Sequence, residues 1–213
     1  MKTYLSCFLI CLAISAKAQQ VEDLFKASDT KISWLGIDFS HVQLVGDFAQ
    51  FNSAGEKSSV EMKTKYFPAW NKIIVDEAKK YDVKGMLRKE HMTYDLDMIA
   101  DLNSKTATEE LEVNNPVPYS REDIEKFVKA YNLKSKSGIG VALIAETLNK
   151  RELQAVYHFV AIDLASNNVL VYDRLTGKPA GFGLRNYWAN TIYDVIKEIK
   201  GERYKEWKKK YAK

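Results

Sequence analysis

The sequence predicts a single α+β domain, a two-layer sandwich in which helices cover a mostly antiparallel sheet of about five strands. Three observations carry this prediction. Apolar residues recur with helical spacing in the middle and at the end of the chain, three consecutive strand-like runs precede the last helix, and no repeat or linker divides the 213 residues. The expected order is strand, helix, strand, helix, three strands, helix.

Residues 1–18 are predicted to be a cleaved secretory signal rather than part of the fold. Lys2 supplies a positive start, residues 4–16 form a mostly apolar run, and the "AKA" at 16–18 offers small residues to a signal peptidase. The run is too short to span a bilayer comfortably, and no second candidate segment follows. We therefore expect an exported protein, periplasmic or secreted, whose mature domain covers residues 19–213 and has no transmembrane segment.

Cysteine content and charge exclude several classes of function. Both cysteines, Cys7 and Cys11, lie in the signal, so the mature chain can form no disulfide, zinc–thiolate site or cysteine nucleophile. A lipid anchor on Cys11 is disfavoured because Ile10, not a small residue, precedes it. The formal net charge of +4 falls to +2 without Lys2 and Lys17, and this near-neutral, exported chain is not expected to bind nucleic acid.

The first half of the domain predicts two strands and two helices. "KISWLGIDF" (31–39) is typical of a buried strand, whereas residues 40–59 leave open a short helix or a long loop. Pro68 suits a first helical position. The apolar stripe of this helix comprises Phe67, Trp70, Ile73, Ile74, Ala78 and Tyr81. Residues 91–102 alternate between apolar and polar and predict a half-buried strand, and Ser120 with Asp123 predicts a capping box at the second helix.

The second half predicts a three-stranded meander and a closing helix. Residues 138–148, 153–164 and 168–175 are the strands, and His158 is expected to be hydrogen-bonded in the core. The closing helix has a stripe formed by Leu184, Tyr187, Trp188, Ile192, Val195, Ile196 and Ile199. Residues 197–213 then carry eight Lys or Arg against three Glu, which fits a solvated terminal helix and leaves open a contact with an anionic lipid or glycan.

The most distinctive text is "TGKPAGFGLRNYWANTIYDVI", residues 176–196. Tyr187 and Trp188 lie on the helical stripe, so we expect them to anchor the helix in the core. Gly181 and Gly183 directly precede the helix, where free backbone N–H groups favour an anion. The alternative is therefore a site for an anionic ligand. Its candidate ligand-binding residues are Gly181, Gly183, Arg185, Asn186 and Asp173.

Arg185 decides between these two interpretations. A cation in the first turn of a helix opposes the helix dipole by roughly 0.3–1 kcal/mol, so such a residue usually has a partner. The partner is either a carboxylate of the sheet, Asp173 or Asp163, or an acidic ligand.

Signals for catalysis are sparse. Asp38 and His41 form a D-x-x-H pattern at the end of a buried strand, and together with Asp163 they are the candidate catalytic residues. The alternative is that Asp38 or Ser40 caps the following turn while His41 packs beside it. No nucleophile-elbow, zinc-protease, EF-hand or nucleotide-binding motif is present, so the sequence predicts neither a metal nor a cofactor.

"KISWLGIDFSHVQLVGDF", "KYFPAWNKI" and "YDRLTGKPAGFGLRNYWANTIYDVIKEI" together resemble a group of uncharacterised exported proteins of Bacteroidetes-type bacteria. The resemblance spans residues 31–199, and its most specific part is a "GGFG-RNYW" signature. Ala180 stands where that signature has a further glycine. More distantly, the element order and the "VYDRLTG" turn are similar to the small α/β domain of curli-secretion-type and Tol-system-type envelope proteins. These resemblances imply an architecture and an envelope location, and they supply no catalytic residue.

These observations favour a non-enzymatic envelope protein, a binding or assembly module. Its partner would be another envelope protein, an acidic small ligand or a glycan. The alternative is a periplasmic hydrolase in which Asp38, His41 and Asp163 act on an anionic substrate that Arg185 orients.

Overall fold

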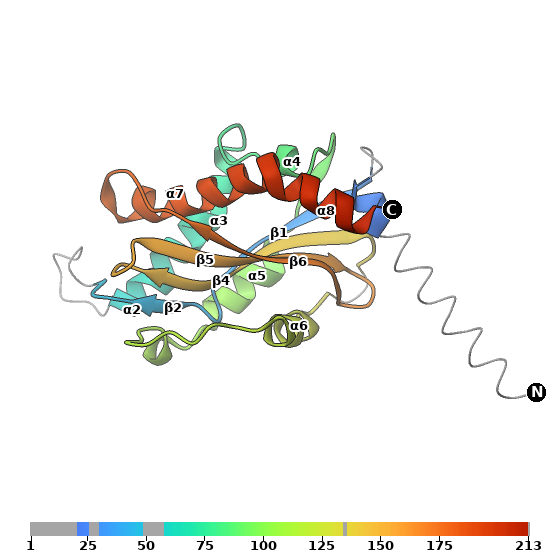
Figure 1. Cartoon of the computed structure of the whole chain (residues 1–213). Coiled ribbons are helices and arrows are strands. Elements are labelled where there is room, and N and C mark those ends of the chain that lie inside the picture. Colours follow the sequence, from blue (N-terminus) through green and yellow to red (C-terminus); the bar gives the residue numbers. More distant parts are fainter. Residues whose placement is uncertain (1–20, 26–29, 49–57, 134–135, 213) are drawn as a thin grey trace, which may run out of the picture.

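The computed structural model describes residues 21–25, 30–48, 58–133 and 136–212, which form one domain around a central sheet (Figure 1). The sheet has six strands in the order β3-β1-β4-β5-β6, and β2 also pairs with β4. The strands are β1 (Ile32–Asp38), β2 (Gln43–Val45), β3 (Met92–Tyr94), β4 (Ile139–Asn149), β5 (Gln154–Asp163) and β6 (Asn168–Gly177). Residues 1–18, the predicted signal, lie outside the described residues.

The long ladders of the sheet are antiparallel and the short ones are parallel. β4, β5 and β6 form the predicted meander, whereas β1 pairs in parallel with β3 and β4, and β2 pairs in parallel with β4. The sheet is open, with β3 and β6 at its edges. The predicted combination of helices with a mostly antiparallel sheet is confirmed. The sheet has six strands rather than about five because β2 forms in the segment that the sequence left open.

The helices form two long runs and several short ones. The first run is α2 (Ser58–Glu61), a π-helical turn (Met62–Tyr66) and α3 (Phe67–Asp76), and the last is α7 (Gly183–Glu198), a second π-helical turn (Ile199–Arg203) and α8 (Tyr204–Tyr211). Between them lie α4 (Val83–Met86), α5 (Asp97–Ser104), a 3₁₀ turn (Thr108–Glu110) and α6 (Arg121–Lys129). Residues 21–25 are also helical.

Both faces of the sheet are buried, which explains why its central strands are apolar on both sides. Val141 and Leu143 of β4 pack into a large cluster with α3, α7 and α8, whereas Ala142 and Ile144 pack into a smaller one with α5 and α6. Figure 1 shows α7 and α8 crossing one side of the sheet and α6 lying on the other. Trp207 of α8 stacks on Phe159 of β5, with ring centroids 4.6 Å apart.

The predicted strand over residues 91–102 is wrong beyond its first residues. Only Met92–Tyr94 pair with β1, and the chain then turns into α5. The residues of α5 that are buried, Ile99 and Asn103, lie four apart, which is helical spacing. The alternation of apolar and polar residues in this segment is also compatible with the spacing of a helix that buries one face. Likewise α3 ends at Asp76, so Tyr81 is buried from the following loop rather than from the helix.

Several local predictions are confirmed. Ser120 and Asp123 form the capping box of α6, in which the Asp123 N–H donates to Ser120 Oγ over 3.2 Å. Trp188 is buried in the core, as its place on the stripe of the closing helix predicted. No helix among the residues that the structure describes is long and apolar enough to cross a membrane.

Candidate binding site

The start of α7 is an exposed turn. Gly181 and Gly183 have φ values of 104° and 76°, a conformation that glycine adopts without strain, and the Phe182 side chain between them is 96% exposed. The Arg185 carbonyl accepts a hydrogen bond from Trp70 Nε1 over 2.9 Å, which ties the helix start to α3. Trp188, one turn further, is fully buried. A shallow hollow of about 340 Å³ adjoins this turn.

Neither carboxylate expected for Arg185 contacts it. Its guanidinium is exposed and lies 3.4 Å from Asn186 Oδ1. Asp173 accepts a hydrogen bond from Trp207 Nε1 over 2.9 Å, and Asp163 accepts bonds from Ala165 and Ser166 in the β5–β6 turn. The two aspartates therefore stabilise α8 and the turn, respectively.

Asp38 and His41 occupy structural positions. Asp38 is fully buried; one of its oxygens accepts the Ser40 N–H over 2.8 Å and the other accepts the Tyr131 hydroxyl over 2.7 Å. Burial and the nearby Asp38 charge raise the pKa of Tyr131 well above its ordinary value. The His41 ring stacks on Phe127 of α6 at 3.7 Å, and desolvation lowers the pKa of His41 although the Asp38 charge opposes this. This is the arrangement of a capped turn beside a packed histidine.

The candidate catalytic residues are not brought together. Asp38 pairs with Ile144 on β4, whereas Asp163 pairs with Ile139, so the two aspartates lie on the order of 15 Å apart along the sheet at about 3.3 Å per residue. Arg185 belongs to α7, which packs on one face of the sheet. Phe127, on which His41 stacks, packs on the other face.

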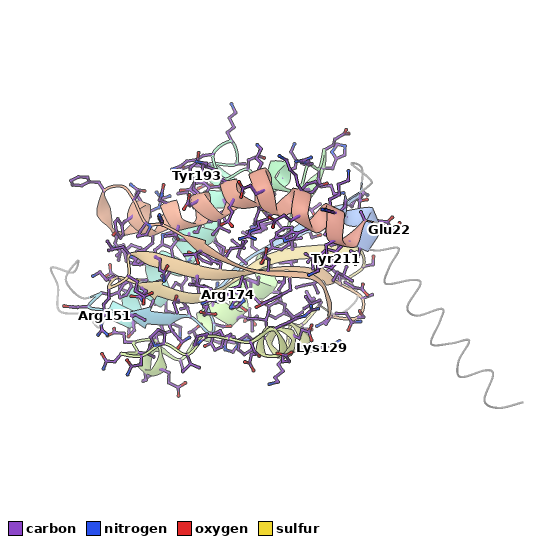
Figure 2. All side chains as sticks on the ribbon, in the orientation of Figure 1. Glu22, Lys129, Arg151, Arg174, Tyr193 and Tyr211 are labelled. Atoms are coloured by element: carbon purple, nitrogen blue, oxygen red, sulfur yellow. The ribbon has the colours of Figure 1, made fainter. Side chains whose placement is uncertain are left out.

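A buried charged cluster that sequence reasoning missed joins β4, β5 and β6, and Arg174, its member on β6, is labelled in Figure 2. Glu146, whose side chain is only 2% exposed, accepts hydrogen bonds from His158 Nε2 (2.8 Å), from Arg174 Nη2 (2.6 Å) and from the Tyr119 N–H (3.2 Å). Because an ionised carboxylate only accepts, His158 Nε2 donates in this bond, and His158 Nδ1 lies 3.1 Å from the Tyr172 hydroxyl. His158 is thus hydrogen-bonded in the core, as predicted.

This cluster holds a carboxylate that stays ionised well below the pH at which an ordinary glutamate is protonated. Burial alone would raise the pKa of Glu146, but the bonds from His158, Arg174 and Tyr119 outweigh it and lower the pKa to about 2. A carboxylate with so low a pKa is a poor base, and its oxygens already accept hydrogen bonds from His158, Arg174 and the Tyr119 N–H. The cluster therefore joins the three strands through charge-assisted hydrogen bonds. The signal in the sequence was a glutamate in a strand that is otherwise largely apolar, and a buried carboxylate requires a partner.

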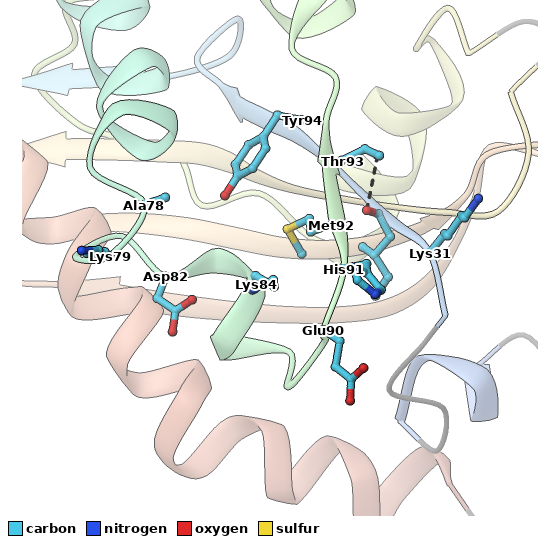
Figure 3. Close-up of a pocket in the computed structure, with 11 residues that line it drawn as sticks. Lys31, Ala78, Lys79, Asp82, Lys84, Glu90, His91, Met92, Thr93 and Tyr94 are labelled. Atoms are coloured by element: carbon cyan, nitrogen blue, oxygen red, sulfur yellow. Dashed lines mark hydrogen bonds between the residues drawn. The ribbon is translucent and has the colours of Figure 1, made fainter.

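A hollow lies along the edge strand β3. It measures about 880 Å³ and is bounded by β3, by the loop after α3 and by α4 (Figure 3). In Figure 3 the Tyr94 and Met92 side chains lie on the side of β3 that faces Ala78 and Asp82. Tyr94 is 39% exposed, so its ring is open to solvent at this hollow.

The main chain of β3 is unpaired on its outer side. The Asp95 N–H donates to the Trp34 carbonyl over 2.9 Å, and this sets the phase of the parallel ladder with β1. The peptide groups of Met92 and Tyr94 consequently turn away from β1. Within the described parts of the chain these groups have no hydrogen-bond partner. They form an open strand edge beside the hollow.

The charges around this hollow favour an acidic partner. Lys31, Lys79 and Lys84 line it, and the acidic lining residues are Asp82 and Glu90. Asp82 is held by Lys200 Nζ at 2.8 Å and by the Gly85 N–H. Burial opposes ionisation of Asp82, but these bonds prevail and its pKa is lowered. Since Lys200 neutralises Asp82, the surface keeps a positive surplus.

The adjoining edge of β1 is closed. Asn71 Oδ1 accepts the Ile37 N–H over 2.7 Å, and Asn103 Oδ1 accepts the Phe39 N–H over 2.7 Å. These side-chain amides replace a neighbouring strand where β3 has already ended. On this side of the sheet, the open edge within the described residues is therefore the short stretch of β3.

Comparisons with known proteins add no assignment: the chain matches no protein-family model and no curated protein. The resemblances to exported and envelope proteins therefore stay predictions. Among the residues that the structure describes, no group of three or more His, Cys, Asp or Glu side chains could hold a metal ion.

Proposed function

We propose that the protein is an exported, non-enzymatic binding module that captures an extended, acidic segment of another envelope protein on the edge of β3. The observation that carries this proposal is the pair of unpaired peptide groups, at Met92 and Tyr94, beside a hollow of about 880 Å³. Addition of a strand to an open edge is a common mode of peptide recognition, in which main-chain bonds supply affinity and side-chain pockets supply specificity.

Each part of the hollow has a role in this proposal. The outward peptide groups bond the incoming strand, and Tyr94 forms an apolar wall for one of its side chains. Lys31, Lys79 and Lys84 favour carboxylates on the partner. Export, with a mature chain starting near Gln19, belongs to the same proposal. The two-layer architecture is also part of this proposal: α3, α7 and α8 form the main helical layer, and α5 and α6 partly cover the other face of the sheet.

The geometry supports a binding module over the hydrolase. Asp38 bonds Ser40 and Tyr131, and Asp163 caps a distant turn, so these candidate residues do not share a substrate position. We expect no turnover of activated ester or phosphate-ester substrates by the mature protein. A hydrolytic activity that Asp38→Asn abolishes would contradict the proposal.

The decisive experiment compares two substitutions at Tyr94. Peptides selected from a displayed library of random extended sequences are measured against the wild type, Tyr94→Ala and Tyr94→Pro. Both variants lose the aromatic side chain, but only proline also removes the outward N–H, which an edge strand tolerates. We expect Tyr94→Ala to weaken binding modestly and Tyr94→Pro to abolish it, with acidic residues enriched among the selected peptides.

The β6 edge serves as the control. Thr176→Pro changes the other edge strand, and selected peptides should bind this variant as they bind the wild type. If Tyr94→Ala and Tyr94→Pro bind peptides equally, main-chain pairing with β3 is ruled out.

A further inference from the structure

A second hollow, of about 580 Å³, lies between α3 and α5 and is independent of the peptide site on β3. Its walls are apolar and are formed by Pro68, Val75, Leu96 and Ala100. Val75 is 40% exposed, one of the few large apolar side chains that the described residues leave open to solvent. Small-molecule sites in proteins typically have this size and are mostly apolar with a few polar groups.

The hollow is preformed because two asparagines hold its floor. Asn71 of α3 and Asn103 of α5 both line it, and both are more than nine-tenths buried. Each donates its side-chain N–H to the Ile37 carbonyl, over 3.0 and 2.9 Å. Since both helices are tied to one atom of β1, they cannot close over the hollow without breaking these buried bonds.

The rim carries two lysines, Lys63 and Lys72, and one carboxylate, Asp76, so a net positive charge remains. Lys63 donates to the Thr106 carbonyl over 2.7 Å, and Lys72 pairs with Asp76 on the same helix. An ammonium group has three N–H donors, so each lysine retains donors for a ligand. The described residues that line it include no aromatic side chain that could stack on a ring.

We infer that this hollow binds a linear aliphatic chain that carries an anionic head group, with the chain against Val75 and Leu96 and the head group at Lys63 and Lys72. Aliphatic walls accept methylene groups without geometric preference, and the cationic rim selects the head. A free fatty acid and the acyl chain of an anionic lipid share this chemistry.

The test is a chain-length series. Octanoate, decanoate and dodecanoate, each below its micellar concentration, are titrated calorimetrically into the mature protein. A buried methylene contributes about 0.8 kcal/mol, so we expect affinity to rise about fourfold for each methylene added until the hollow is full. Ala100→Phe, which fills the hollow from the exposed side of α5, should reduce the affinity for decanoate at least tenfold.

Charge variants locate the head group. The double variant Lys63→Gln/Lys72→Gln should weaken decanoate several-fold and leave a neutral decyl glycoside unchanged. The matched control, Lys79→Gln/Lys84→Gln, removes two lysines from the β3 hollow and should bind decanoate like the wild type. A parallel experiment measures binding to vesicles that contain phosphatidylglycerol. If the protein binds these vesicles but not the free acids, and Ala100→Phe abolishes this binding, the ligand is an acyl chain of the bilayer.

Two results would overturn the inference. One is an affinity for carboxylates that does not change with chain length. The other is binding, to free acids or to vesicles, that a folded Ala100→Phe variant retains in full. Circular dichroism of Ala100→Phe establishes that the variant is folded.

Discussion

Asn71 and Asn103, which come from two different helices, donate to the same atom, the carbonyl oxygen of Ile37, over 3.0 and 2.9 Å. Their side-chain oxygens accept the N–H groups of Ile37 and Phe39. Together the two amides complete the hydrogen bonding of β1 where β3 ends. They close one part of the sheet edge, set the spacing of α3 and α5, and confine the open edge on this side to β3.

Asn103→Ala tests the closed edge. The substitution leaves the buried Phe39 N–H without its acceptor, and an unsatisfied buried donor costs about 1–3 kcal/mol. We expect the free energy of unfolding, from urea denaturation, to fall by that amount. Asn114→Ala, on an exposed loop, should change it by less than about 0.5 kcal/mol. Equal effects of the two substitutions would show that the amide bonds contribute nothing.

Glu146 should make stability depend on pH in the acid range. Its folded pKa of about 2 lies below the ordinary value of 4.5, so its contribution is fully present above about pH 4.5 and is lost as pH falls toward 2. The difference corresponds to about 3 kcal/mol. Urea unfolding between pH 7 and 2 should therefore show a steeper acid loss in the wild type than in Glu146→Gln.

The control for this prediction is Glu125→Gln, which removes an exposed carboxylate paired with Arg121. Its pH profile should parallel that of the wild type. If the profiles of Glu146→Gln and the wild type also coincide, the buried cluster does not stabilise the ionised state of Glu146.

Phe182 and Trp188 should respond oppositely to truncation. Phe182 is 96% exposed, so Phe182→Ser is expected to change the free energy of unfolding by less than about 0.5 kcal/mol. Trp188 is 1% exposed and stacks on Phe48, so Trp188→Ala should cost about 3–5 kcal/mol. Chemical denaturation of both variants distinguishes a solvent-facing residue from a core anchor, and a costly Phe182→Ser would place Phe182 in the core.

Gly177 is required for the contact between β6 and α7. It ends β6, and a Cβ there would lie 2.1 Å from the Thr191 carbonyl oxygen. Gly177→Ala should therefore destabilise the protein by about 1–3 kcal/mol in thermal or urea unfolding. Gly201→Ala, where a Cβ meets nothing within 4 Å, is the matched control and should be neutral or stabilising.

The candidate sites were less predictable than the elements. Glu146, His158 and Arg174 lie on three strands, and they meet only because of the register that pairs His158 with Arg174 and Ile144. The residues singled out around Gly181 share one short segment, which makes them conspicuous in the sequence. Residues that are close in the sequence need not contact one another in the fold, and Arg185 contacts neither Asp173 nor Asp163, the carboxylates predicted for it.

The sequence by itself determined the elements whose signals are local. The meander β4–β5–β6, the capping box at Ser120 and the apolar stripe of α7 each depend on residues a few positions apart. Tertiary structure alone decided that residues 97–104 form a helix, because the alternation in 91–102 fits a strand as well and packing against β1 selects between them. It also decided where the sheet is open and where it is closed. Edges and hollows arise between segments distant in the chain, and no local pattern encodes their approach.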